Sequence, residues 1–195
     1  MKLVTLPVIL LLLSGCSQSL DDYQQIQPKL TLPGFFSGSS QAFGVLQNWR
    51  GQQTLHFSAE LCGQWQGNRG DLYEIFQYSD GRTDKRHWQL QVAENGEISG
   101  SAEDVIGQAS GRIAGNTLYW EYVLRIPQTD GAIDVAVKDW LYLVTPQQLV
   151  NRSTLHKFGL TVGELTLSIQ QLDPAVSCAG FIQRYQQTER SAPAA

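Results

Sequence analysis

Apolar and polar side chains alternate along most of the chain from Phe43 onward, and this two-residue period predicts β-strands. The alternation is clearest in residues 54–65, where leucine, phenylalanine and alanine take every second position. Turn residues separate the runs, and this part of the chain has no convincing helical period. We therefore predict an all-β, antiparallel fold of about 8–10 strands in sequence order, an up-and-down barrel or strongly curved sheet, with a β-sandwich as the alternative.

Residues 72–90 predict a β-hairpin whose apolar side carries two opposite charges. A two-residue loop would turn the apolar faces of the two strands to opposite sides of the sheet. A three-residue loop, Ser79-Asp80-Gly81 with a left-handed glycine in a bulge, keeps both faces on one side and places Glu74 opposite Arg86. The sequence therefore predicts an inward-facing ion pair between Glu74 and Arg86.

Two further turns predict how the neighbouring strands pair. The tight Gly-Asn turn before the strand of Trp120 places this indole opposite Gly111, and such pairing of large with small residues fills a tapering barrel. A two-residue turn at Asn95-Gly96 pairs Val105 with Arg86 and points Val105 inward. Both registers are consistent with one continuous sheet.

Polar residues on the apolar face form the candidate site. Asp139 lies among the apolar residues of a later strand, and two carboxylates against Arg86 leave one carboxylate in excess. We expect that carboxylate to be protonated, solvated, or paired with a ligand or with Lys157. The alternative is a buried charge network that satisfies itself and only fixes the strand register. The predicted ligand-binding residues are Glu74, Arg86, Trp88, Trp120, Asp139, Asn151 and Lys157, with Tyr78 and Tyr122 as further walls.

Patterns typical of catalysis or metal binding are absent from the sequence. His56, His87 and His156 fall on the polar phases of their strands, without the spacing of metal ligands. No G-x-S-x-G motif, P-loop or zinc spacing occurs. We expect no catalytic residue, metal or cofactor, and a glycosidase-like acid–base pair of Glu74 and Asp139 is the alternative. A net charge of −4 without a Lys/Arg run gives no footprint for nucleic acid.

Residues 1–15 are predicted to be a lipoprotein signal peptide. Lys2 precedes a short apolar run that ends in Leu13-Ser14-Gly15-Cys16. These four residues resemble the lipobox of bacterial lipoproteins, which implies a diacylglyceryl-modified Cys16 as the mature N-terminus and as a membrane anchor. In such lipoproteins Ser17 after the cysteine implies the outer membrane of a Gram-negative cell. An ordinary secretory signal with an unmodified Cys16 is the alternative.

The remaining chain divides into three predicted parts. Residues 16–40 are polar and interrupted by proline and glycine, which predicts a lipidated tether and a lead-in segment whose few apolar residues pack over one end of the domain. Residues 41–172 are predicted to form the barrel domain, and residues 173–195 a tail that is mostly disordered except near Cys178. Cys62 faces outward in its strand, so we expect either a disulfide with Cys178 across the outer surface or two unpaired thiols.

The chain also resembles a family of uncharacterised bacterial lipoproteins, the domain of unknown function DUF3833. The matching motifs are Phe36-Ser37-Gly38, Gly44-Val45, Leu72 with Glu74 and Phe76, Asp80-Gly81 with Arg86 and Trp88, Asp104-Val105-Ile106-Gly107, Asp139-Trp140, Asn151-Arg152 and Lys157-Phe158-Gly159. The resemblance implies an exported lipoprotein with a lipocalin-like β-barrel and no established activity. An association of relatives with fatty-acid-modifying enzymes favours a lipid-like ligand.

These observations lead to one functional hypothesis and two alternatives. We expect a non-enzymatic, lipocalin-like protein, anchored to the outer membrane on its periplasmic side, that binds a hydrophobic or lipid-derived small molecule. The first alternative is an envelope assembly or scaffold lipoprotein with a solid barrel and a protein partner. The second alternative is an enzyme that acts on modified lipids.

Overall fold

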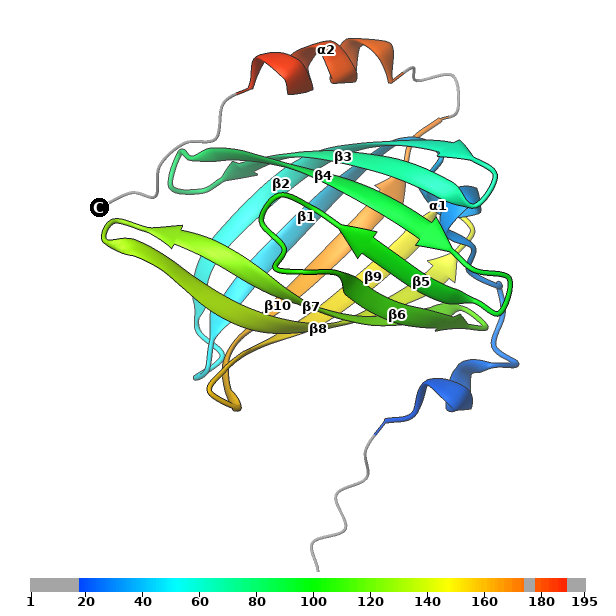
Figure 1. Ribbon diagram of the computed structural model, residues 1–195, viewed down its shortest axis with the longest axis horizontal. Helices are drawn as coiled ribbons and strands as arrows, with labels where there is room; N and C mark the ends of the chain where they lie inside the picture. The colour runs from blue at the N-terminus through cyan, green and yellow to red at the C-terminus, as the bar shows by residue number, and fades with distance from the viewer. Residues whose placement is uncertain (1–17, 174–177, 189–195) are drawn as a thin grey trace, which may run out of the picture.

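Ten antiparallel strands close into a barrel in the computed structural model, which describes residues 18–173 and 178–188 (Figure 1). Each strand pairs with the next along the chain, and the first strand pairs with the tenth. This arrangement confirms the predicted up-and-down barrel and excludes the sandwich. The strands are β1 (Gly38–Asn48), β2 (Gln53–Gln66), β3 (Arg69–Tyr78), β4 (Thr83–Val92), β5 (Glu97–Ser101), β6 (Ala109–Ala114), β7 (Thr117–Gln128), β8 (Gly131–Thr145), β9 (Gln148–Lys157) and β10 (Leu160–Gln171).

The lead-in segment packs on the barrel along its described length. It forms the 3₁₀-helix η1 (Leu20–Tyr23) and the short helix α1 (Leu32–Phe36), which lies at one end of the barrel (Figure 1). Four apolar residues of this segment, Leu30, Leu32, Phe35 and Phe36, join the main core, as predicted, whereas Ile26 is 41% exposed. Within the predicted tether and lead-in, contact with the barrel begins by Gln18, which donates a hydrogen bond to Tyr142 Oη at 2.7 Å, and Leu20 is buried. The predicted signal peptide 1–15 and Cys16 lie outside the described residues.

The register between β3 and β4 follows the predicted three-residue loop. Glu74 lies opposite Arg86, and the Tyr78 amide donates to the Arg82 carbonyl at 2.9 Å. Gly81 closes the loop with a φ of 86°, a left-handed conformation that favours glycine. The register between β6 and β7 is confirmed as well, since Trp120 lies opposite Gly111.

The predicted register after Asn95-Gly96 is wrong by one residue. The loop contains three residues instead of two, because the Ala93 amide donates to the Glu97 carbonyl at 2.8 Å. Such a loop with a left-handed glycine matches the twist of the flanking strands, as the β3–β4 loop does. Val105 therefore does not pair with Arg86, and it forms an isolated bridge with Leu124 instead.

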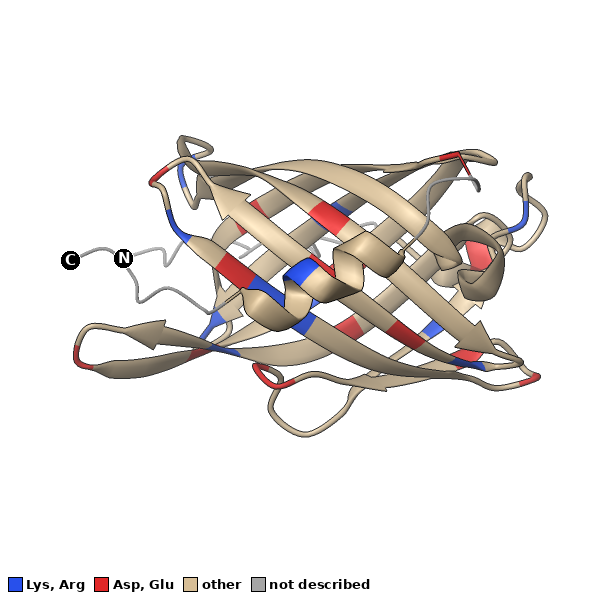
Figure 2. Ribbon diagram, turned by 90° about the horizontal axis from the view of Figure 1, so that it is seen from above, with Lys and Arg blue, Asp and Glu red and all other residues tan. Residues whose placement is uncertain are grey.

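The tail contains a helix that the sequence analysis did not predict. Helix α2 (Ala179–Gln187) lies on the outside of the barrel beside β3, and the face it covers carries acidic and basic residues interspersed (Figures 1 and 2). Cys62 and Cys178 form a disulfide with their Cα atoms 5.8 Å apart, and Phe181 is buried next to it. The disulfide and this apolar contact hold a segment that its composition alone marks as disordered.

Phe35→Ala tests whether α1 belongs to the core of the barrel. Phe35 is 2% exposed, so its truncation removes packing from the closed end of the barrel. We expect the free energy of unfolding in urea to fall by about 3–5 kcal/mol. Phe43→Ala is the control, because Phe43 is 57% exposed on β1 and its loss should cost less than about 1 kcal/mol. Equal losses in the two variants would contradict this role of α1.

Candidate ligand-binding cavity

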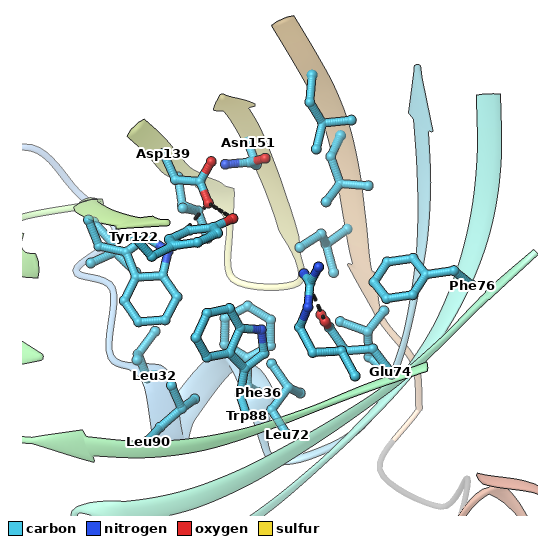
Figure 3. A pocket seen from close by; sticks show the side chains of 18 of the residues that line it. Leu32, Phe36, Leu72, Glu74, Phe76, Trp88, Leu90, Tyr122, Asp139 and Asn151 are labelled. Carbon is cyan, nitrogen blue, oxygen red and sulfur yellow. Dashed lines mark hydrogen bonds and ion pairs between the residues drawn. The ribbon is translucent and has the colours of Figure 1, made fainter. Parts of the chain in front are cut away.

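A cavity of about 120 Å³ lies inside the barrel between α1 and the middle of the strands (Figure 3). Most of its wall is leucine, phenylalanine and tryptophan. An engineered apolar cavity of about 150 Å³ admits benzene, so the enclosed space suits a head group or a few carbon atoms of a larger molecule. The polar residues that line it are Glu74, Arg86, Tyr122, Asp139 and Asn151.

Six of the seven predicted ligand-binding residues line this cavity, and Lys157 does not. Alternation along β9 places Lys157 on the inward-facing side of the strand, but Lys157 is the last residue of β9. It lies six residues beyond Asn151, roughly 20 Å along the strand, at the rim of the barrel. Its ammonium group is 5.4 Å from the ring centre of Phe158 instead of a carboxylate of the site. The expectation that Lys157 completes the interior charge set is therefore wrong.

The guanidinium of Arg86 is held mainly by Asp104. Its Nε and Nη2 donate three hydrogen bonds to the Asp104 carboxylate at 2.8–3.0 Å, and Nη1 is 3.8 Å from Glu74 Oε2. Burial lowers the pKa of Arg86, but the charge of Asp104 and then that of Glu74 outweigh it and leave the pKa above its usual value. Arg86 is therefore a fixed cation whose strongest hydrogen bonds are already used.

Asp104 is the functional residue that the sequence reasoning missed. It lies in the connection between β5 and β6, where the predicted register put Val105 against Arg86. A three-residue loop at Asn95-Gly96 would have moved Asp104 to that position. The length of this loop therefore decides whether Asp104 or Val105 lies opposite Arg86, and the loop resembles the correctly predicted three-residue β3–β4 loop.

Glu74 lies beside Arg86, and one of its oxygens has no hydrogen bond. Burial raises the pKa of Glu74 to about 7, although the charge of Arg86 opposes the rise. Its Oε2 is buried and accepts no hydrogen bond from the described residues. Near neutral pH this carboxyl group can therefore exist with or without its proton, so it accepts hydrogen bonds when ionised and can also donate one when protonated.

Asp139 provides a second free acceptor on another wall of the cavity. Tyr122 Oη at 2.8 Å and Trp120 Nε1 at 3.3 Å both donate to Asp139 Oδ2. Oδ1 is buried and accepts no hydrogen bond of good geometry within the described part of the chain, although Ser153 and Asn151 lie near the carboxylate. Burial raises the pKa of Asp139, and hydrogen bonding by Ser153, Tyr122, Asn151 and Trp120 offsets part of that rise. Figure 3 shows Glu74 and Asp139 on different strands, with Trp88 between them in this view.

The barrel is closed beside α1 and opens at the other end. Inward-facing residues next to α1 are buried, whereas those toward the β1–β2 and β9–β10 hairpins are partly exposed. The polar groups lie between these two regions, so a molecule that enters from the open end meets apolar walls before it reaches them. The partly exposed residues are Leu46, Leu55, Phe57, Leu155 and Leu165.

Comparison with protein families identifies the chain. A family model described as "Protein of unknown function (DUF3833)" matches residues 10–171. The chain belongs to the DUF3833 family. A search of the curated proteins found no match. Among solved structures, the S-type phycobiliprotein lyase CPES from Guillardia theta is similar at 7% identity and a TM-score of 0.49, over 70% of this chain and 89% of that chain. That similarity is too distant to support a functional argument.

The cavity of this DUF3833 protein differs from a metal site. In residues 18–173 and 178–188 no group of three or more His, Cys, Asp or Glu side chains could hold a metal ion. The carboxylates of the cavity instead contact an arginine, a tyrosine and a tryptophan. Their free oxygens are suited to accept hydrogen bonds from an organic group.

Asp104→Asn and Glu74→Gln should differ in their effect on stability. Asp104 is the main partner of Arg86, and removal of its charge leaves a largely buried cation short of a partner. We expect Asp104→Asn to lower the free energy of unfolding at pH 7 by about 2–4 kcal/mol in urea denaturation. Glu74→Gln should change it by less than about 1 kcal/mol, since Glu74 is partly protonated at that pH. Similar losses in both variants would contradict the assignment of Asp104 as the main partner.

Glu74 should also make the stability of the DUF3833 barrel depend on pH. Its pKa is raised from 4.5 in the unfolded chain to about 7, so the folded state binds the extra proton between these values. The free energy of unfolding should therefore decrease by about 3 kcal/mol as pH rises from 4.5 to 7, relative to Glu74→Gln. Urea denaturation of both proteins across this range measures the difference, in which other titrating groups cancel. A difference that stays constant or grows with pH would contradict the raised pKa.

Proposed function

We propose that this protein is a lipoprotein, anchored to the periplasmic side of the outer membrane, whose barrel binds a hydrophobic or lipid-derived molecule without converting it. The observation that carries the proposal is an apolar cavity with two buried carboxyl groups, each of which keeps one oxygen without a hydrogen bond from the described residues. Buried polar groups are normally hydrogen-bonded, so two free acceptors in one cavity favour a missing donor.

The chemistry of the cavity favours a ligand that donates hydrogen bonds. Both free groups, Glu74 Oε2 and Asp139 Oδ1, are acceptors when ionised. Arg86 is the cation of the cavity lining, and it is already paired with Asp104. A ligand carboxylate would add negative charge to a site with more carboxyl groups than cations. We therefore propose an apolar molecule with a hydroxyl, amide or ammonium group.

The position of the polar groups suggests how such a molecule lies. The enclosed space of about 120 Å³ holds the head group and the first carbon atoms. The remaining chain would extend past Phe57 and Leu165 to the open end, where inward-facing side chains are apolar and partly exposed. Burial of each methylene group in this path contributes about 0.8 kcal/mol to binding.

The anchor in this proposal is the expected lipid group on Cys16. Gln18, two residues after it, is bonded to the barrel wall at Tyr142, so the barrel would be held close to its membrane. In the part of the chain that the structure describes, no helix is both long and apolar enough to cross a bilayer. The described residues also contain the complete barrel, its core and its disulfide. A chain that starts at Ser17 should therefore fold without the anchor and is suitable for binding measurements.

Three ligands of equal chain length test the proposal: dodecanol, dodecylamine and dodecanoate. Calorimetry with the chain from Ser17 should show that the alcohol and the amine bind about tenfold or more tightly than the carboxylate, because the free groups of the cavity are acceptors. Glu74→Gln combined with Asp139→Asn should reduce this preference. Tryptophan emission provides a second readout, since Trp88 and Trp120 line the cavity.

The matched control is Asp134→Asn, which removes a carboxylate on the outside of the barrel that is paired with Arg125. This variant should keep the preference of the unmodified chain. Tightest binding of dodecanoate would exclude the proposed head-group chemistry. If none of the three ligands binds, and the protein purified from its own membrane carries no lipid in native mass spectrometry, the binding function is wrong.

A further inference from the structure

Two neighbouring hairpins at the open end of the barrel expose large apolar side chains. The β1–β2 tip (residues 49–52) and the β9–β10 tip with the residues after it (157–162) are adjacent, because Asn48 lies opposite Gly163. We call these two segments the hairpin tips. Their apolar residues and exposed fractions are Trp49 67%, Phe158 93%, Leu160 71% and Val162 40%. Other exposed apolar residues, such as Phe43 and Val144, lie singly on the barrel wall.

The backbone at Phe158 makes its exposure unusual. Phe158 has a φ of 52° and Gly159 a φ of 79°, so both residues of this two-residue turn are left-handed. Such turns favour asparagine followed by glycine, and phenylalanine is disfavoured at the first position. Within the described chain the ring gains little packing, since it is 93% exposed. A contact outside this chain would account for a phenylalanine at this position.

Basic residues accompany the two aromatic rings. The guanidinium of Arg50 is 4.6 Å from the ring centre of Trp49, and the ammonium group of Lys157 is 5.4 Å from that of Phe158. Neither hairpin tip contains an acidic residue. The other hairpins at this end carry Asp80 and Asp130, and Arg82 beside Tyr78 is paired with Asp80. The hairpin tips therefore differ from them in combining aromatic and basic residues without an acidic residue. Aromatic rings beside Lys or Arg are typical of segments that lie at the interface of an anionic bilayer.

The start of the described chain lies on the same side of the barrel as the hairpin tips. In Figure 1 both tips and η1 project from the lower side, the tips at the open end and η1 beside the β6–β7 turn at the α1 end, whereas α2 covers the upper side. Cys16 is two residues before Gln18, which the chain can span by at most about 7 Å. A lipid group on Cys16 would therefore keep this side of the barrel at the membrane.

We propose that the hairpin tips insert into the surface of an anionic phospholipid bilayer and hold the open end of the barrel against it. The role that we give to this contact, transfer of a ligand between the bilayer and the cavity, rests on the proposed function. A hydrophobic ligand could then pass between the bilayer and the cavity along the apolar wall, without crossing water. The contact itself requires only the exposed rings and the basic residues beside them, so it can be tested without a ligand.

Flotation with lipid vesicles tests the proposal on the chain that starts at Ser17, which lacks the lipid anchor. Vesicles of phosphatidylethanolamine with phosphatidylglycerol should carry the protein, and vesicles of phosphatidylcholine alone should carry less of it. The double variant Trp49→Ser, Phe158→Asn should lower the partition coefficient about tenfold or more. Phe158→Asn creates the Asn-Gly turn that this backbone favours, so the fold should be retained.

The matched control is Phe43→Thr, which removes an exposed aromatic ring from the barrel wall and should leave flotation unchanged. Brominated phospholipids should quench tryptophan emission of the unmodified chain, and Trp49→Ser should remove most of that quenching. Failure of the unmodified chain to float, or equal flotation of the double variant, would overturn the proposal. Self-association through the hairpin tips in gel filtration, without flotation, would show that a second copy covers them and would also overturn it.

Dodecanol binding separates this proposal from the proposed function. The double variant should still bind dodecanol in its cavity, since Trp49 and Phe158 do not line it. If flotation depends on the hairpin tips but dodecanol does not bind, the membrane contact is supported and the proposed ligand binding is wrong. Dodecanol binding without flotation would retain the ligand and reject the membrane contact.

Discussion

The ion pair between Arg86 and Asp104 is the constraint on which the interior of this barrel depends. A guanidinium group inside a barrel is tolerated only if a carboxylate accompanies it, and that carboxylate comes from the connection between β5 and β6. The connection therefore has to fold inward, where β5 and β6 are the shortest strands. Because Asp104 accepts the hydrogen bonds of Arg86 Nε and Nη2, Glu74 has only a 3.8 Å ion pair to Nη1, and its Oε2 stays without a hydrogen bond.

Helix α1 provides the apolar wall at one end of the cavity. It fills one end of the barrel with apolar side chains, so the charged groups in the middle face a dry wall on one side and the opening on the other. Desolvation by burial is the largest cause of the raised pKa of Glu74. Leu32 and Phe36 of α1 line the same cavity, so the segment before the barrel helps to form the environment of this carboxyl group.

Alternation along the strands was sufficient to predict the barrel, the inward phase of Glu74, Arg86 and Asp139, and most of the cavity wall. Alternation does not predict how far along the barrel axis a residue lies. Lys157 faces inward by alternation, but it lies at the rim because it is the last residue of β9. Turn residues do not separate a two-residue from a three-residue loop at Asn95-Gly96, and this ambiguity hid Asp104. Helix α2 depends on contacts distant in sequence, a disulfide to Cys62 and the burial of Phe181, which no local pattern records.

The pairing of β1 with β10 has a consequence for how the protein is made. The sheet closes only when residues near Gln171 reach those near Ser40, so nearly the whole chain must be present before the barrel is complete. Until then β1 has an open edge, which can pair with other chains. Contacts of such long sequence separation also form slowly. If the chain leaves the ribosome or crosses a membrane from its N-terminus, the barrel therefore cannot close until β10 is available. The risk of aggregation through the edge of β1 is highest before that point.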